Sequence, residues 1–281
     1  MQTNSINRLT IDWNALRTEV FNTAGAAQTI EDTFPAIRLA ITRLRDGHSS
    51  YRAANGTVIF VALRSCVGSG GPSPGTLPPN IGYVSVGAFG GSAAEALAFA
   101  NGIQDRIRNA DRDDLIGWIV DLRGNGGGNM WPMIAGLGAI IGDDVLGYFI
   151  GPTGTETRWE FRDGASWIGG SIAQRVDNPY RLRRVRPRVA VIVDNAIASS
   201  GEATFIAFRQ RPDTRSFGVP TCGLSTANSS YPVGNGATLV LTTSVMADRL
   251  KTRYGDSIAP DETIEGRDRT MARAVEWLEG R

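Results

Sequence analysis

The sequence predicts an α/β fold preceded by a helical segment, and three observations support this prediction. From about residue 81 onward, predicted strands alternate with predicted helices, a pattern typical of sheets covered by helices. The runs 115–122 and 188–193 are almost wholly apolar, as expected for strands buried on both faces. Before residue 47, apolar residues instead recur every three or four positions, which indicates amphipathic helices. We therefore predict an N-terminal helical cap with a linker over 1–78 and an α/β core over 79–281.

Two helices are predicted in the N-terminal part. The first follows Asp12, whose side chain can accept hydrogen bonds from the first helical N–H groups. The second extends to Leu44 and begins close to Asp32, because Pro35 is tolerated only in the first turn of a helix. Gly47 follows its end and can supply a left-handed cap.

The core begins after a segment rich in Gly, Pro and Ser over 66–80, which predicts a loop. Ser92 and Glu95 have the spacing of a capping box at the start of a helix. The predicted strands are 57–63, 81–86, 115–122, 145–150, 155–161, 188–193 and 238–245. The predicted helices after the loop are 92–107, 129–141, 202–208 and 270–278.

Composition limits the classes of function. The 281 residues, 42% of them hydrophobic and 20% charged, are those of an ordinary globular protein with a sizeable core. A net charge of +1 argues against a nucleic-acid partner, and the arginines over 181–188 are interpreted as a solvated loop and strand edge. No apolar run reaches the length of a membrane span, and the N-terminus lacks the pattern of a signal peptide.

Few side chains can serve metal or proton chemistry. The chain has one histidine, His48, and one lysine, Lys251. Cys66 and Cys222 have no metal-binding spacing, and a bridge between them is possible although the sequence does not establish it. We therefore expect no metal ion and no organic cofactor.

Three segments carry candidate chemistry. Residues 191–202 predict a strand, a polar turn and a helix that opens with Ser199 and Ser200, so that a hydroxyl lies next to backbone N–H groups. Residues 121–129 place a glycine run between a strand and a helix, where the backbone can turn sharply and approach a ligand. That run lacks the ending of a nucleotide-binding loop, and alone it is a tight turn. The third segment, 217–226, predicts only a loop.

In this order, the three segments resemble the C-terminal processing (tail-specific) serine peptidases. Their relatives include the tricorn core protease and the repeats of interphotoreceptor retinoid-binding protein. The resemblance covers about residues 81–264, and residues 46–51 and 258–261 also resemble segments of that family. It implies a twisted Clp-protease/crotonase-like sheet core. The stretch of about 30 residues between Ser50 and Ile81 is too short for the PDZ module that many relatives carry.

The resemblance also implies roles for individual residues. Ser199 matches the nucleophile, three residues before Glu202, and Ser200 is the alternative. The oxyanion hole is expected from backbone N–H groups of Gly127 or Gly128 and of Ser200.

The general base is expected to be a histidine. The processing branch uses a lysine where this chain has Leu224, which cannot accept a proton. His48 stands where the tricorn-like branch has its histidine, and a neutral imidazole is available at physiological pH. The group that orients this imidazole is left open among Ser49, Asp256 and Asp261, with Asp256 the nearest carboxylate to the expected position.

These roles predict a serine peptidase that cleaves a peptide or protein substrate through an acyl-enzyme. The alternative is a non-catalytic module that binds an apolar ligand or peptide, as the retinoid-binding relatives suggest. Acyl-CoA chemistry on the related crotonase architecture is less favoured, because it does not require a serine at position 199. The resemblance further suggests a periplasmic or extracellular location.

Overall fold

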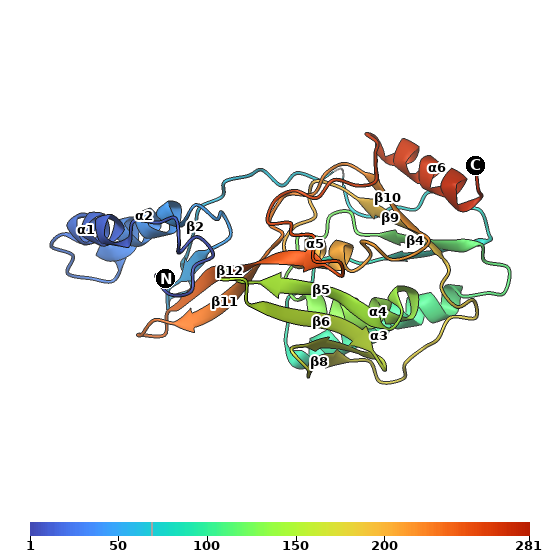
Figure 1. Cartoon of the computed structure of the whole chain (residues 1–281), viewed down its shortest axis with the longest axis horizontal. Helices are drawn as coiled ribbons and strands as arrows, with labels where there is room; N and C mark the ends of the chain where they lie inside the picture. Colours follow the sequence, from blue (N-terminus) through green and yellow to red (C-terminus); the bar gives the residue numbers. More distant parts are fainter. Residues whose placement is uncertain (69) are drawn as a thin grey trace. The chain divides into compact units, whose positions relative to one another are not determined.

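The computed structural model describes residues 1–68 and 70–281, so Ser69, in the predicted loop 66–80, lies outside the described residues. The chain is a mixed α/β protein, as predicted (Figure 1). Its helices are α1 Trp13–Ala24, the short 3₁₀ helix η1 Glu31–Thr33, α2 Phe34–Leu44, α3 Ala93–Ala110, α4 Met130–Ile141, α5 Ser200–Ile206 and α6 Arg267–Leu278. Its strands are β1 Ser50–Arg52, β2 Val58–Phe60, β3 Ile81–Ser85, β4 Gly117–Asp121, β5 Asp144–Ile150, β6 Glu156–Arg162, β7 Ala165–Ile168, β8 Ser171–Arg175, β9 Arg188–Val193, β10 Thr214–Gly218, β11 Thr226–Pro232, β12 Thr238–Asp248 and β13 Glu262–Thr263.

The chain folds into two compact units that are interleaved along the sequence. The first unit comprises residues 1–65, 150–156 and 226–245, and the second comprises 66–149, 157–225 and 246–281. The predicted boundary lies instead at a single place, between residues 78 and 79. The difference arises because β11 and most of β12 pair within the N-terminal unit, and such long-range pairing leaves no trace in a local pattern.

The first unit is an antiparallel sheet with a helical layer. β1 pairs with β2 on one side and with β12 on the other, and β12 also pairs with β11. Ile41 and Leu44 of α2 pack against Leu239 and Leu241 of β12, which anchors the helix on the sheet. This packing fixes the start of the loop that follows α2.

The end of α2 corrects one expectation. Arg45 adopts the left-handed conformation that caps the helix, with φ of 56°, so the cap comes two residues before Gly47. Gly47 has φ of 63° as well, and a Cβ atom there would lie 3.1 Å from the side chain of Leu63. The glycine is therefore required by the loop after the helix rather than by the helix end.

The second unit is built on a parallel five-stranded sheet in the order β13-β10-β9-β4-β3. Alternate residues of β4 and β9 face opposite sides, and both strands are almost completely buried, as predicted for covered strands. Figure 1 shows α6 on one side of this sheet and α3 and α4 on the other. The carboxyl ends of β4 and β9 lie next to each other, because the two strands are parallel neighbours.

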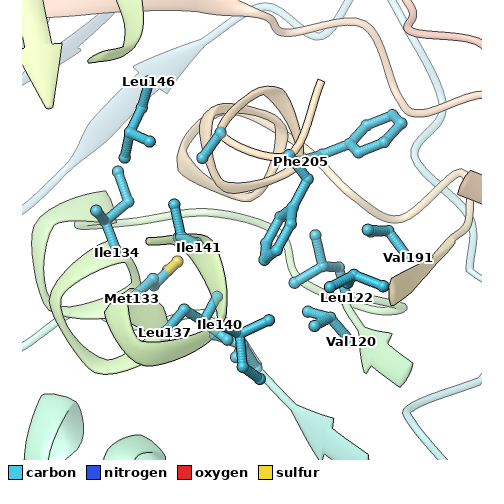
Figure 2. Packing of buried hydrophobic residues seen from close by; sticks show 14 of the residues in the cluster. Val120, Leu122, Met133, Ile134, Leu137, Ile140, Ile141, Leu146, Val191 and Phe205 are labelled. Atoms are coloured by element: carbon cyan, nitrogen blue, oxygen red, sulfur yellow. The ribbon is translucent and has the colours of Figure 1, made fainter. Parts of the chain in front are cut away.

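One large apolar cluster holds the helices to this sheet. Val120 and Val191 point from the sheet toward Ile134 and Leu137 of α4 and toward Phe205 of α5 (Figure 2). Each fully buried side chain of this size contributes about 1.5–3 kcal/mol to folding. The cluster therefore fixes α4 and α5, the helices that follow the glycine run of residues 121–129 and the turn that carries Ser199.

Several strands of the structure were not predicted from the sequence. β7 and β8 follow β6 as an antiparallel meander, and β1, β10, β11 and β13 are short or polar. The predicted strand 57–63 contracts to Val58–Phe60, and the predicted loop 217–226 contains the end of β10 and the start of β11. Among the described residues, no helix is both long enough and apolar enough to cross a bilayer.

Candidate functional site

Ser199 sits on a sharp turn between β9 and α5. Its backbone has φ of 53° and ψ of −118°, a conformation that a non-glycine residue rarely adopts. Such a conformation costs about 1–3 kcal/mol and persists only where the surroundings impose it. A strained strand-to-helix turn of this type exposes the hydroxyl of its serine above the sheet. Ser199 is partly exposed, unlike its neighbours on either side.

Ser200, the alternative nucleophile, has a different environment. Its side chain is buried, and its Oγ donates a hydrogen bond of 2.7 Å to the carbonyl oxygen of Gly128. The hydroxyl thus ties the start of α5 to the glycine turn. It is therefore less available for attack on a substrate than the hydroxyl of Ser199.

The carboxyl group of Glu202 holds the Ser199 turn through hydrogen bonds. Its Oε2 accepts a hydrogen bond of 2.9 Å from the backbone N–H of Ser199. Its Oε1 accepts from Thr221 Oγ1 at 2.6 Å and from the N–H of Gly223 at 2.9 Å, and the N–H of Leu224 also bonds to the carboxyl. Burial raises the pKa of Glu202 to about 7, and the four hydrogen bonds oppose that shift.

The glycine turn after β4 packs directly on the Ser199 turn. Gly127 has φ of 101°, and a Cβ atom there would lie 2.7 Å from the carbonyl oxygen of Ala198. At Gly128, with φ of 106°, a Cβ atom would lie 1.9 Å from the carbonyl oxygen of Phe89. No other residue type fits these two positions, so the glycines allow the two loops to approach each other.

The backbone N–H groups at this turn differ in whether they donate a hydrogen bond. The N–H of Gly127 donates to Asn125 Oδ1 at 3.1 Å. By contrast, those of Gly128 and of Ser200, the first residue of α5, have no acceptor among the described residues. Two unengaged N–H groups beside a strained serine can stabilise a developing negative charge on an oxygen atom.

The strand end beside the glycine turn is fixed by a buried ion pair. The side chains of Asp121 and Arg123 are almost completely buried and lie 2.6 Å apart. Tyr83 donates a further hydrogen bond of 2.9 Å to Asp121, and Arg123 also donates to the carbonyl oxygen of Ser73 in the 66–80 loop. These contacts engage Nε and Nη2 of Arg123, while its Nη1 is buried without a hydrogen-bond partner among the described residues. The arrangement suits a role in positioning the turn.

A disulfide joins Cys66 to Cys222, with the two Cα atoms 5.0 Å apart. Cys222 lies between Thr221 and Gly223, both of which donate to Glu202. The N–H of Val67, next to the other cysteine, donates to Asn195 Oδ1 at 3.2 Å. The start of the 66–80 loop is thereby fastened to the segments that carry the Ser199 turn and its support.

His48 lies in the first unit, on the loop between α2 and β1. Its N–H and that of Ser49 both donate to Asp46 Oδ1, at 2.9 and 2.7 Å. The imidazole Nδ1 lies 2.8 Å from Thr226 Oγ1, and the carbonyl oxygen of His48 accepts from Asn228 at 3.2 Å. Burial lowers the pKa of His48 to about 4, although Asp46 opposes the shift. The imidazole is consequently neutral at physiological pH.

Thr226 was missed by the sequence analysis as a partner of the histidine. It lies 178 positions away in the chain, and only the pairing of β11 within the first unit brings it to His48. No motif marks it, since a threonine at the start of a strand is common. The signal could have come only from knowledge of that strand pairing.

The three groups proposed to orient the imidazole have other partners. Ser49 Oγ donates to Asp46 at 2.6 Å and accepts from the N–H of Thr242. Asp261 accepts hydrogen bonds from Arg209, at 2.7 Å, and from the backbone and side chain of Ser216. Asp256 is exposed and accepts from the N–H of the residue that follows it. Within the first unit, Thr226 and not Ser49 contacts the ring.

No group of three or more His, Cys, Asp or Glu residues that could hold a metal ion occurs in the described parts of the chain.

Comparisons with known proteins show what this chain is similar to. The model of peptidase family S41 matches residues 80–264. The nisin-resistance protein of Lactococcus lactis subsp. lactis is 29% identical over 196 residues, which cover 69% of this chain. The match spans only 59% of the length of that relative.

Two solved structures share the fold. A lipoprotein from Streptococcus agalactiae superposes with a TM-score of 0.77 at 22% identity, covering 100% of this chain and 92% of the other. A protein from Parabacteroides merdae superposes with a TM-score of 0.60 at 17% identity, covering 96% and 89%. At these identities the likeness concerns the fold alone.

Proposed function

Because this chain belongs to peptidase family S41, we propose that it is a serine peptidase in which Ser199 is the nucleophile and His48 the general base. The observation that carries the proposal is the Ser199 turn. It combines a serine of positive φ, in the turn after a parallel strand, with two N–H groups that have no acceptor among the described residues, those of Gly128 and Ser200. This combination supplies both a nucleophile and the means to stabilise a tetrahedral intermediate.

The environment of His48 supports a role as base. If Nδ1 carries the proton and donates it to Thr226 Oγ1, then Nε2 keeps its lone pair and can accept a proton. We propose this tautomer, with Thr226 in the orienting role that the sequence analysis assigned to Ser49, Asp256 or Asp261. The low pKa of His48 keeps the ring in its accepting form down to about pH 4, at some expense of basicity.

The proposed reaction proceeds through an acyl-enzyme. Ser199 Oγ attacks the carbonyl carbon of the substrate while His48 accepts the hydroxyl proton, and the N–H groups of Gly128 and Ser200 donate to the oxyanion. The C–N bond then breaks, and His48 returns the proton to the leaving amine. Water attacks the resulting ester, His48 accepts a proton from it, and that proton returns to Ser199 as the acid product leaves.

Gly128 is the better of the two glycine candidates for the oxyanion hole. The N–H of Gly127 is already donated to Asn125, whereas that of Gly128 has no acceptor among the described residues. Losing one oxyanion donor typically raises the barrier by about 3–4 kcal/mol.

Peptides and proteins are the substrate class that membership of this family suggests. The 29% identity to a nisin-resistance protein makes nisin the first substrate to test. Incubation of the folded chain with nisin, followed by mass spectrometry, should reveal cleavage fragments that the Ser199→Ala variant does not produce.

Labelling by a fluorophosphonate tests the nucleophile directly. We expect wild type to be labelled, Ser199→Ala to be unlabelled and His48→Ala to be labelled much more slowly. Ser200→Ala tests the alternative nucleophile: it should still be labelled, because its backbone N–H remains, but more slowly than wild type, because the hydrogen bond to Gly128 is lost. Equal labelling of wild type and Ser199→Ala would contradict the assignment. A folded wild type that is never labelled would instead favour the non-catalytic binding module.

A further inference from the structure

We propose that Glu202 is the positioning residue of the Ser199 turn and that its charge controls how fast Ser199 reacts. The ionised carboxylate fastens the nucleophile to the 221–224 loop, and its neutral form releases that bond. This inference rests on the proposed function of Ser199, and it adds a control that the Ser199–His48 pair does not contain.

The contacts of Glu202 require a carboxylate. Its two oxygens accept hydrogen bonds from four donors: the backbone N–H groups of Ser199, Gly223 and Leu224 and the hydroxyl of Thr221. A carboxylate is acceptor-only, with about four lone-pair positions, so it satisfies all four donors. A protonated carboxyl or a carboxamide would turn a donor of its own toward this set.

Ser199 depends on this support more than an ordinary residue does. Its φ of 53° is unfavourable for a serine, so the turn needs a contact that holds the backbone in place. The hydrogen bond from its N–H to Glu202 Oε2 is such a contact, made directly at the strained residue. If it is lost, the backbone can relax and the hydroxyl leaves its position beside the N–H groups of Gly128 and Ser200.

The same carboxylate fixes a second segment. Thr221 and Gly223 flank Cys222, whose N–H donates to the carbonyl oxygen of Ile197, two residues before Ser199. Thr221 Oγ1 also accepts from the N–H of Ile258. Glu202 thus closes a network in which the Ser199 turn and the 221–224 loop hold each other.

Glu202 changes its protonation state within the physiological pH range. Burial raises its pKa to about 7, and no charged neighbour is among the causes of the shift. The elements packed around Glu202 do carry titratable groups. These are Asp194 after β9, which accepts from the N–H groups of Gly124 and Ala196, and the Asp121–Arg123 ion pair after β4. Tyr254 and Asp256 flank Gly255, whose N–H donates to Ser225 Oγ at the end of the 221–224 loop, and the same hydroxyl donates to the carbonyl oxygen of Asp256. Cys222 does not titrate because it is bonded to Cys66.

This titration separates Glu202 from the proposed base. The pKa of His48 is about 4, so protonation of the imidazole would slow the reaction only in acid. A decline of the reaction rate with a midpoint near pH 7 would be the signature of Glu202.

As pH rises, the contribution of Glu202 to the free energy of unfolding should change in the direction opposite to the reaction rate. The folded state keeps the Glu202 proton up to about pH 7, whereas the unfolded chain releases it near 4.5. Between these values the folded state binds more protons, so the Glu202 contribution to the free energy of unfolding falls as pH rises. The proposal requires the reaction rate to rise over the same range. A purely structural role for Glu202 would make the rate follow stability.

The test is the second-order rate constant of fluorophosphonate labelling, measured from about pH 5 to about pH 9. For wild type we expect a rise with a midpoint near pH 7. Glu202→Gln should react roughly tenfold or more slowly at high pH and should lose this midpoint, because a carboxamide does not titrate. Glu265→Gln, which neutralises an exposed carboxylate in the same unit, is the matched control and should behave as wild type.

Thr221→Val provides a second test that does not depend on the folding of Glu202→Gln. It removes one hydrogen bond that lowers the pKa of Glu202, so the midpoint should move to higher pH. Thermal unfolding of each variant over the same pH range reports stability.

The outcomes distinguish the two proposals. A wild-type protein that is labelled without a midpoint near pH 7, or a Thr221→Val midpoint that does not move, overturns the role of Glu202 alone. Retention of the wild-type midpoint in folded Glu202→Gln does the same. A folded wild type that is not labelled at any pH overturns the peptidase and, with it, the control by Glu202.

Discussion

The Ser199 turn and the His48 loop are held in place by different kinds of interaction. At Ser199 the backbone itself is in an unfavourable conformation, and the glycine turn and Glu202 enforce it. At His48 the backbone is held by Asp46 and the ring meets the hydroxyl of Thr226. The first arrangement depends on close packing, which tolerates little change, whereas the second depends on hydrogen bonds that can be exchanged one at a time.

Removal of the proposed base should have the largest effect. His48→Ala should lower the rate of fluorophosphonate labelling by roughly 10²–10⁴-fold, the contribution typical of general-base catalysis. Its thermal unfolding should change little, because the backbone contacts of Asp46 remain. A rate within twofold of wild type would show that the two regions do not act together.

Opening the disulfide tests the packing on the Ser199 side. The Cys66–Cys222 bond closes a loop with a sequence separation of 156. Replacing both cysteines by serine should lower the free energy of unfolding by about 2–5 kcal/mol, as measured by urea denaturation. It should also slow labelling, since Cys222 lies between two donors to Glu202. Unchanged values for both would show that the loop is fastened without the bond.

A methyl group in the glycine turn should strain the same region. Gly127→Ala places a Cβ atom 2.7 Å from the carbonyl oxygen of Ala198 at a φ of 101°. We expect a loss of about 1–3 kcal/mol in the free energy of unfolding and slower labelling. Gly126→Ala is the control, because a Cβ atom there meets nothing within 4 Å. Equal behaviour of the two variants would refute the close approach.

The smallest effect is expected at the hydroxyl beside the imidazole. Thr226→Val should reduce labelling by roughly threefold to tenfold, in line with about 0.5–1.5 kcal/mol for one hydrogen bond. Thr226→Ser keeps the hydroxyl and should retain the wild-type rate. If Thr226→Val is labelled as fast as wild type, another group orients the imidazole, and the hydrogen bond to Thr226 does not hold His48 in its reactive position.

Local patterns predicted the parts of the fold that depend on local interactions. The strands β4 and β9, the capping box of α3 and the glycine turn follow from apolar runs and from the spacing of a few residues. The resemblance to the processing peptidases was confirmed by the match to peptidase family S41.

The remainder depends on contacts between distant segments. The interleaving of the two units and the meeting of Thr226 with His48 follow from the pairing of β11 and β12 with one another and of β12 with β1. The hydrogen bonds of Glu202 are equally nonlocal, since its donors come from two separate segments. Helices and strands can be recognised in a sequence by the regular spacing of their apolar residues. Long-range strand pairing and buried hydrogen-bond networks produce no such regular spacing.

The order in which the chain is synthesised gives the interleaving a further meaning. Tyr51 of β1 pairs with Leu239 of β12, so the first unit lacks a central strand until β12, which begins at Thr238, has been synthesised. At about 5–20 residues per second, the N-terminal helices wait on the order of tens of seconds for that partner. Folding therefore cannot proceed from the N-terminus in a simple succession, and a nascent chain stopped before residue 238 should expose the apolar face of α2 to chaperones.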